Sequence, residues 1–435
     1  MSCSVVKALG AATLPAMLLA ALIHAARGPG AGASSETVSF AAVVSAAGQS
    51  GAMGGPLGAA RLLATDPGTG GASAVGERAA EAASEPPAAD GASARKAGEV
   101  FPWPEGAAAG PAGGPSATEL PSRLLVLDAA EPGQVRAVGL GAVYWDPIAS
   151  LAAVGDHVYV IDGRGVLSAL DVADPLRPAE VGLADAPRDV VAVVVAGRYG
   201  YLAAGPDGLG VVDLAEPRRP VPLDAARLPG RAMDVAVAGR YAYVASGYDG
   251  LRVVDLGVPD QPAVVGALAL PGYALGVAVV GDYAYVATGY GGLQVVGVGD
   301  PANPRRAGEL TLARPGLSGR TYLRAITAAD GYAYVLDFET GLHVLDLAEP
   351  SRPVEVGGHD VPGSAHRLVV AGTTLYVAAG PCGLRLIDVA TPTQPVEIGA
   401  IRPLGATQDV AVAGRYAYVS TVPTDHPGGC AGARP

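Results

Sequence analysis

The sequence repeats itself from about residue 121 onward, and this repeat limits the folds open to the chain more than any other feature. A Leu-x-Val-Val-Asp motif recurs every 42 or 43 residues with one interval of 49, and a tyrosine among small or branched apolar residues keeps the same spacing. The first motif begins at Leu124, Leu167, Leu209, Leu251, Leu293, Leu342 and Leu384, and the second centres on Tyr159, Tyr201, Tyr243, Tyr285, Tyr334, Tyr376 and Tyr418. Two markers with one period indicate seven copies of one structural unit.

Each unit contains four short apolar segments separated by turn residues, which we call strands a to d. In the unit from Asp234 to Leu268, Gly239 and Arg240 form a two-residue turn between strands a and b, and turns containing Gly or Pro precede strands c and d. Four strands in about 42 residues is the period of a propeller blade. The sequence therefore predicts an all-β fold, a seven-bladed β-propeller of four-stranded blades over residues 121–421.

The two ends of the repeat complement each other. The chain enters with strands c and d alone, from Leu124, and leaves with strands a and b alone, from Asp409. Pairing the two ends by backbone hydrogen bonds would complete the seventh blade and remove exposed strand edges. We therefore expect a ring closed by a split blade, with N-terminal strands c and d beside C-terminal strands a and b.

The sequence of the repeat resembles that of a known family. The Leu-x-Val-Val-Asp string is followed by Asp/Glu-Pro-x-x-Pro and preceded by a Gly-Arg/Asp-Tyr-Ala-Tyr-Val hairpin. Over residues 124–420 the chain is similar to the LVIVD-repeat proteins of bacteria, with Gly297 standing where Asp is usual. The resemblance implies a propeller on a secreted or surface protein, and it implies no reaction.

The segments outside the repeat have compositions of their own. In residues 1–33 a long uncharged run rich in Ala and Leu follows Lys7, which predicts a signal peptide or, if uncleaved, an N-terminal membrane anchor. Residues 34–120 are mostly Ala, Gly, Pro and Ser, which predicts a disordered linker. Residues 422–435 form a C-terminal tail. We expect an extracytoplasmic protein that touches a membrane only through the anchor.

The charge of the chain narrows the choice of partner. A formal net charge of -12, with no cluster of Lys and Arg to offset it, would repel nucleic acid. We therefore expect a protein or glycan partner, no nucleic acid, and a monomeric propeller.

The repeated polar residues predict architecture and not chemistry. An acid ends strand c in six units and precedes a turn, where a carboxylate can accept N–H groups; these acids are Asp128, Asp171, Asp213, Asp255, Asp346 and Asp388. The repeated tyrosines should pack between blades. The sequence shows no nucleophile motif and no histidine pair at metal-ligand spacing, so it predicts no catalytic residue, metal or cofactor. An active site assembled from separate blades would leave no local motif, so enzymatic activity stays open.

Departures from the repeat indicate a binding face. Because strands alternate in direction, the b-to-c and d-to-a connections share one face of the ring, which also carries seven extra residues near Tyr322. The candidate residues on this b–c/d–a face are Tyr144, Trp145, Tyr248, Tyr273, Tyr290, Tyr322, Arg324, Phe338, His366 and Arg367, with Asp146, Asp249 and Glu339 beside them. Aromatic side chains among mixed charges are typical of binding sites. The alternative is that turn tyrosines are merely half-buried.

A second candidate site lies at the channel mouth. Counting back five positions from each hairpin glycine gives the equivalent starts of strand a, which are Ser150, Ala192, Asp234, Gly276, Ile326, Arg367 and Asp409. If strand a is innermost, Asp234, Arg367 and Asp409 face the channel. They could hold a cation or a polar ligand, but we favour simple solvation by channel water.

Two cysteines are candidates for a disulfide. Cys382 lies in the b-to-c turn of the sixth unit, and the chain from Thr421 to Cys430 is long enough to reach back to it. A bridge between Cys382 and Cys430 suits an exported chain, and the alternative is two free thiols.

These observations support a non-catalytic binding or scaffolding module. The alternative is a small-molecule hydrolase or lactonase with a polar site around Asp234, Arg367, Asp409 and His366. Carboxylates that converge beside a perturbed His or Arg would favour chemistry, and divergent side chains would favour binding.

Overall fold

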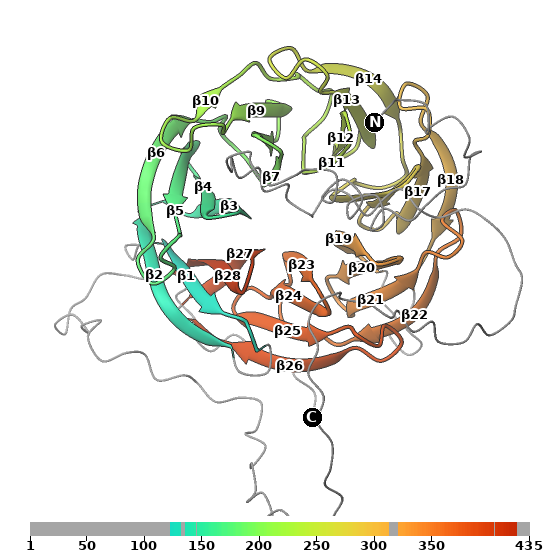
Figure 1. Ribbon diagram of the computed structural model, residues 1–435. Coiled ribbons are helices and arrows are strands. Elements are labelled where there is room, and N and C mark those ends of the chain that lie inside the picture. The colour runs from blue at the N-terminus through green and yellow to red at the C-terminus, as the bar shows by residue number, and fades with distance from the viewer. Residues whose placement is uncertain (1–121, 132–134, 145, 313–320, 404, 424–435) are drawn as a thin grey trace, which may run out of the picture. The chain divides into compact units, whose positions relative to one another are not determined.

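The computed structural model describes residues 122–131, 135–144, 146–312, 321–403 and 405–423. They form seven four-stranded antiparallel sheets in a ring, which confirms the predicted propeller (Figure 1). Strands a, innermost, are β3 (Ile148–Val154), β7 (Ala192–Ala196), β11 (Asp234–Ala238), β15 (Gly276–Val280), β19 (Leu323–Ala329), β23 (Arg367–Ala371) and β27 (Ala406–Ala413). Strands b are β4 (His157–Asp162), β8 (Tyr199–Ala203), β12 (Tyr241–Ala245), β16 (Tyr283–Ala287), β20 (Tyr332–Asp337), β24 (Thr374–Ala378) and β28 (Tyr416–Val422).

The outer half of each blade consists of strands c and d. Strands c are β5 (Val166–Asp171), β9 (Leu209–Asp213), β13 (Leu251–Asp255), β17 (Leu293–Gly297), β21 (Gly341–Asp346), β25 (Leu384–Asp388) and β1 (Ser122–Asp128). Strands d are β6 (Ala179–Asp185), β10 (Val221–Pro222), β14 (Ala263–Leu268), β18 (Arg305–Leu310), β22 (Val354–His359), β26 (Val396–Ile401) and β2 (Arg136–Tyr144). We number the blades 1 to 7 in the order of their strands a, so that blade 1 begins with β3 and blade 7 with β27.

Blade 7 is the predicted split blade. Its strand order is β2-β1-β28-β27, so the N-terminal strand β1 pairs with the C-terminal strand β28. The antiparallel register runs from Arg123 opposite Thr421 to Asp128 opposite Tyr416. The side chain of Arg415 also donates to Asp128, with 3.0 Å between Nε and Oδ1. Closure therefore rests on a full-length strand pairing.

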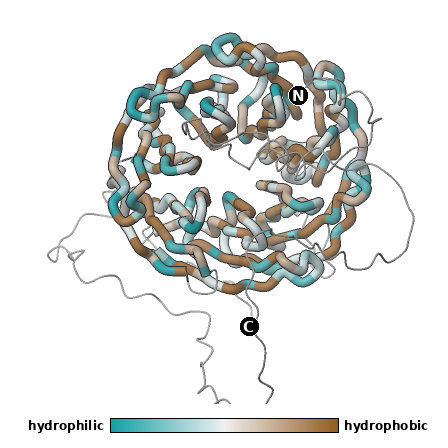
Figure 2. Tube along the Cα trace, viewed as in Figure 1, coloured by the Kyte–Doolittle hydropathy of each residue, from teal (hydrophilic) through white to brown (hydrophobic). Residues whose placement is uncertain are grey.

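The core lies between neighbouring blades. Each hydrophobic cluster draws on two adjacent sheets, and in one of them Tyr201 and Val211 of blade 2 pack with Val235 and Val244 of blade 3. Hydrophobic stretches follow the strands, and hydrophilic ones gather at the turns (Figure 2). The repeated tyrosines are all buried, as predicted, and the hydroxyl of Tyr285 reaches the next blade, where it donates to the carbonyl of Pro350 at 3.0 Å.

A glycine in strand d lets adjacent blades approach at their outer edges. A Cβ added to Gly266 would lie 2.1 Å from the carbonyl oxygen of Pro301 in the next blade, and one added to Gly357 would lie 2.2 Å from that of Pro392. No side chain fits in these gaps, so the repeat needs glycine there.

The acids that end strand c act as turn acceptors, as predicted. Each accepts a hydrogen bond from the backbone N–H two residues later, at 2.7 to 3.1 Å. Because these contacts recur around the ring, they stabilise turns and do not form a site.

In blade 5 the predicted register of strand a is wrong by one residue. In the six other blades a glycine takes the first turn position, but here Asp330 has φ 52° and Gly331 follows with φ 82°. The hairpin glycine therefore stands one position later than in the other blades. Ala325, and not Ile326, is the equivalent of Asp234, since both face the corresponding residue of strand b.

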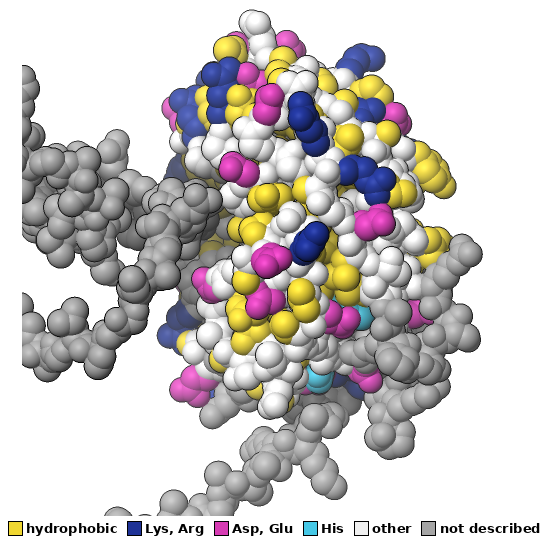
Figure 3. Space-filling model, turned by 90° about the vertical axis from the view of Figure 1, so that its right-hand side faces the viewer, with side chains coloured by type: hydrophobic (Ala, Val, Ile, Leu, Met, Phe, Trp, Pro, Cys, Tyr) yellow, Lys and Arg dark blue, Asp and Glu magenta, His cyan; other side chains and the backbone are white. Residues whose placement is uncertain are grey.

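The outer wall carries charges of both signs. On the side of β18 and β22, acidic and basic side chains are interspersed with small hydrophobic groups (Figure 3). Within the described residues no helix is long and apolar enough to cross a membrane. The predicted signal peptide or anchor, the linker, and most of the tail lie outside the described residues.

Candidate functional site

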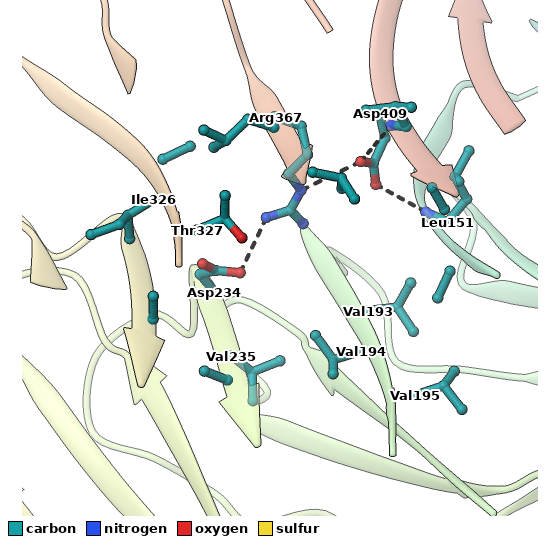
Figure 4. Close-up of a pocket in the computed structure, with 18 of the residues that line it drawn as sticks. Leu151, Val193, Val194, Val195, Asp234, Val235, Ile326, Thr327, Arg367 and Asp409 are labelled. Carbon is teal, nitrogen blue, oxygen red and sulfur yellow. Dashed lines mark hydrogen bonds and ion pairs between the residues drawn. The ribbon is translucent and has the colours of Figure 1, made fainter. Parts of the chain in front are cut away.

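All seven strands a line the central channel. A cavity of about 430 Å³ runs between them, and its walls are mostly Val, Ala and Leu side chains (Figure 4). A second cavity, of about 310 Å³, lies where the d-to-a connections enter the ring, and we call it the channel mouth. Asp234, Arg367 and Asp409 line both cavities, so they lie at the junction between the two.

Arg367 crosses the channel and joins two distant blades. From β23 its Nη1 donates to Oδ1 of Asp234 in β11 at 3.1 Å, and its Nε lies 3.5 Å from Oδ1 of Asp409 in β27 (Figure 4). Its Nη2 also donates to the carbonyl of Val191 at 3.1 Å. The three side chains converge, and we call them the channel triad.

The two carboxylates of the triad are held unequally. Oδ2 of Asp409 accepts from the Ser150 hydroxyl at 2.7 Å and from the Leu151 N–H at 3.0 Å, and Oδ1 accepts from the Val410 N–H at 2.8 Å. Asp234 accepts from the Val277 N–H at 3.0 Å besides its bond to Arg367. Asp409 therefore has the larger set of donors.

One guanidinium serves two carboxylates in the triad, so a negative charge is left over. Burial raises the pKa of Asp234, and the charge of Arg367 and the Val277 N–H only partly oppose this. Burial also works against the charge of Arg367, but Asp409 and Asp234 outweigh it and raise the pKa of the guanidinium. Arg367 thus stays charged, and burial makes Asp234 easier to protonate than an exposed aspartate.

The acids of the channel triad are buried and paired, whereas the sequence analysis favoured simple solvation by channel water. Asp234 is only 8% exposed and Asp409 only 3%. Both carboxylates pair with the guanidinium of Arg367. Because buried charges are costly unless paired, this arrangement is built into the fold.

The lining of the channel mouth includes one residue from each blade, directly before the position that is equivalent to Asp234. Polar side chains come from the neighbouring blades 5, 6 and 7, and apolar ones from blades 1 to 4. The polar half consists of Arg324, His366 and Gln408, and the apolar half of Ala149, Val191, Met233 and Leu275. The mouth therefore has two chemically different sides.

Two repeated tyrosine pairs stand on the b–c/d–a face. Tyr248 packs edge-on against Tyr273 with ring centroids 4.7 Å apart, and Tyr290 packs the same way against Tyr322 at 4.8 Å. Tyr248 and Tyr290, from the b-to-c turns of blades 3 and 4, are 81% and 67% exposed. The partner tyrosines are half-buried, and the hydroxyl of Tyr273 lies 3.5 Å from the sulfur of Met233 in the mouth.

The other predicted face residues differ in their surroundings. Phe338 and Glu339 are exposed in the b-to-c turn of blade 5. Asp146 forms an ion pair with Arg164, and Asp249 forms one with Arg252 at 3.1 Å. Trp145, most of the seven extra residues before Tyr322, and the side chain of Tyr144 lie outside what the structure describes.

Comparison with known proteins assigns the chain to a family. The model described as LVIVD repeat matches it seven times, at residues 148–185, 187–221, 229–269, 271–311, 322–361, 362–402 and 404–422. The chain belongs to the LVIVD repeat family. No curated protein sequence matches it.

Solved structures with low sequence identity share the propeller fold of this LVIVD-repeat chain. The periplasmic gluconolactonase PpgL of Pseudomonas aeruginosa is 16% identical, with a TM-score of 0.53, over 70% of this chain and 100% of that one. A functionally unknown protein of Desulfotomaculum acetoxidans is 13% identical, with a TM-score of 0.51, over 64% of this chain and 96% of that one. At these identities the likeness shows the fold alone.

A set of buried polar residues in the LVIVD repeats was missed by the sequence analysis. The variable second position of the Leu-x-Val-Val-Asp motif, in strand c, is occupied in blades 3 to 6 by Arg252, Gln294, His343 and Arg385. Arg252 donates to the carbonyl of Asp249 at 2.6 Å, and Gln294 donates to that of Gly291 at 2.9 Å. These side chains hold the b-to-c turns that carry the exposed tyrosines.

The same position in blade 5 forms a relay of polar groups. His343 contacts the Thr340 hydroxyl through Nε2 and the Glu355 carboxylate through Nδ1, at 2.7 Å each. Thr340 also donates to Asp337 at 2.9 Å, and His343 is fully buried. We interpret the relay as the turn-holding contact of this blade. No group of acidic, His and Cys side chains among the described residues could hold a metal ion.

The disulfide between Cys382 and Cys430 stays a prediction. Cys382 is buried and disulfide-bonded, whereas Cys430 lies outside the described residues. Peptide mapping of exported protein under non-reducing conditions should recover both cysteines in one cross-linked pair. Closing a loop of about 48 residues corresponds to roughly 4 kcal/mol in the chain-entropy model, so reduction should lower the unfolding midpoint. Recovery of two alkylatable thiols would contradict the pairing.

Proposed function

We propose that this LVIVD-repeat propeller is a non-catalytic binding module that acts outside the cytoplasm and holds a protein or glycan partner on its b–c/d–a face. The observation that carries the proposal is that two tyrosine pairs stand beside the cavity of the channel mouth. Tyr248 and Tyr290 expose large apolar rings that the fold does not need, because blades 2 and 6 build the same turn with Pro206 and Pro381 at this position. Exposed aromatics beside a concave site are typical of binding surfaces.

The channel triad supports binding over hydrolysis. Its carboxylates converge, which on its own favours chemistry, but they converge on Arg367, whose guanidinium lies between them. A general acid or base must reach the proton that it transfers. Asp409 already accepts three hydrogen bonds besides its ion pair, so it serves as a brace.

A lactonase or related hydrolase is the second candidate. Asp234 has a raised pKa beside the mouth, and the fold is shared with a periplasmic gluconolactonase. Turnover of sugar lactones by purified protein, abolished by Asp234→Asn in a variant that remains folded, would favour this activity over binding alone.

Removing the exposed tyrosines should abolish binding without unfolding the propeller. Aromatic contacts at the centre of an interface contribute on the order of 2 kcal/mol each. Replacing both Tyr248 and Tyr290 with Ala should therefore weaken binding by at least about a hundredfold. Binding would be measured on immobilised glycans and on proteins from the producer's envelope, with thermal unfolding as the test of folding.

The matched control changes the opposite face. Leu176 and Val258 are exposed apolar residues in c-to-d loops, at 59% and 54%. The double variant Leu176→Ala with Val258→Ala removes apolar surface there and should bind like wild type. If this control loses binding while the tyrosine variant keeps it, the site lies on the opposite face and the proposal is wrong.

A further inference from the structure

Arg324 is a cation in the channel mouth with no partner among the described residues. It precedes Ala325 in β19 and lines the cavity of about 310 Å³. It forms no hydrogen bond or ion pair with any residue that the structure describes, although it is partly buried. Two other partly or fully buried arginines that line the ring wall have carboxylate partners, since Arg252 pairs with Asp249 and Arg367 with Asp234.

The electrostatic surroundings of Arg324 call for an anion. Burial and the nearby charge of Arg367 lower the pKa of its guanidinium, and only Tyr322 opposes this shift. Burial, and then the charge of Arg324, lower the pKa of His366 to about 4, so His366 is neutral near pH 7. Within the described part of the mouth, Arg324 thus has no carboxylate partner, because both acids of the channel triad pair with Arg367. A buried charge without a counter-ion is costly, and an anionic ligand would relieve that cost.

The rest of the mouth fits one ring-shaped group. Around the ring, neutral His366 lies next to Arg324 and Gln408 lies next to His366, and both can exchange hydrogen bonds with hydroxyls. On the other side of Arg324, Leu275 and Met233 form an apolar wall. The tyrosine pairs stand next to this wall, since Tyr273 contacts Met233 and Tyr322 precedes Arg324 by two residues. A sugar ring with a charged edge and an apolar face matches both halves.

We propose that the channel mouth binds a carboxylated sugar residue of a glycan, with Arg324 as the counter-ion of the carboxylate. The inference rests on the proposed binding function and names its ligand class. Among the described residues of the mouth, Arg324 is the only cation without a partner, and the chain has a net charge of -12, which repels a dense polyanion. These charges favour a glycan with one isolated acidic residue over a polyuronate. The tyrosine pairs would contact neighbouring sugar rings.

The test compares each acidic oligosaccharide with its own neutral form. Oligosaccharides that end in one uronic acid residue are immobilised as an array, together with the same molecules after reduction of the carboxyl to a hydroxymethyl group. The exported protein should prefer the acidic forms by about tenfold to a hundredfold, the range expected for a charge-assisted hydrogen bond. This preference should shrink as salt is added.

Three variants locate the effect. Arg324→Gln keeps hydrogen-bonding capacity but removes the charge, so it should bind acidic and reduced forms equally while retaining affinity for the reduced ones. Arg324→Lys keeps the charge and should retain most of the preference. Arg219→Gln removes an exposed cation from a c-to-d loop on the opposite face and should leave the preference unchanged.

The outcomes separate this inference from the proposed function. Equal binding of acidic and reduced forms by wild type, or an unchanged preference in Arg324→Gln, overturns the carboxylate site even if the tyrosine variant shows that the face binds glycans. Preference for Glu-containing peptides over every acidic oligosaccharide also overturns it, in favour of a protein partner. If wild type binds no glycan and no protein, the binding function itself fails.

Discussion

A chain shortened to end at Pro403 is expected to lose cooperative unfolding and to aggregate. The truncation removes β27 and β28, and with them the pairing partner of β1. Buried side chains such as Tyr418 and Val419 would be lost, and Leu124 and Val126 would become exposed. Each such side chain contributes roughly 1.5 to 3 kcal/mol, so a few of them match a typical total stability of 5 to 15 kcal/mol. An open strand edge also invites association between molecules.

The control for this truncation is a chain that ends at Pro423. It retains β27 and β28 and loses only the residues that follow them. Both chains would be studied with a reducing agent, so that an unpaired thiol cannot cause association. Urea unfolding and size-exclusion chromatography should show a monomer with one transition for the longer chain alone. A shorter chain that is monomeric and equally stable would contradict closure by the split blade.

Most of the fold could be predicted from the sequence because each structural unit repeats the same local rules. The period, the hairpin glycines and the acids that end strand c appear in nearly every copy, so errors in one copy are corrected by the others. Blade 5 shows the limit of this approach. Asp330 occupies a left-handed turn position that glycine takes in the other blades. Counting back from the shifted glycine therefore gave Ile326 as the start of strand a, one residue after the true equivalent Ala325.

The candidate site was only partly predictable, because its contacts depend on distances across the ring. The sequence placed Arg367 at the channel but could not show that its side chain reaches Asp234, which lies 133 residues earlier and three blades away. That Arg324 has no partner among the described residues was also hidden, since pairing is a property of the assembled site. Gln408 and Met233 could have been found by also comparing the residue before each strand start.

The buried polar position of strand c was missed for a different reason. In a sheet with one face exposed to solvent, the side chain of the variable residue in Leu-x-Val-Val-Asp would point to solvent. Here both faces of the sheet pack against neighbouring blades, since Val254 lies in the core shared with blade 2 and Val253 in the core shared with blade 4. Arg252 and His343 are therefore buried and must find partners. A variable position in a repeat therefore does not imply exposure.

Arg367→Met is expected to destabilise the propeller by about 3 to 5 kcal/mol at neutral pH, the usual cost of leaving buried charges unpaired. Met has a similar length and removes the charge and all three donors of the channel triad. Asp234 and Asp409 would then lie in the ring wall without their shared cation. Two like charges in a buried place repel each other and cannot be hydrated as they are in the unfolded chain.

The cost of Arg367→Met should depend on pH in a defined direction. Burial already raises the folded-state pKa of Asp234, and without the guanidinium it would rise further above the unfolded value of about 3.9. A carboxyl with a raised pKa does not destabilise the fold below its unfolded pKa, and the loss of stability grows as the pH rises through its folded pKa. Urea unfolding should therefore show a small difference from wild type near pH 4 and the full difference at pH 7.

Two further variants make the result specific to the triad. Adding Asp234→Asn to Arg367→Met removes one of the stranded charges and should recover part of the lost stability, with a weaker pH dependence. Arg240→Met breaks the exposed ion pair with Asp255 and should change stability far less, because water screens that pair. If Arg367→Met is as stable as wild type at pH 7, or if its deficit does not change with pH, the triad does not brace the channel and its residues are free for a ligand.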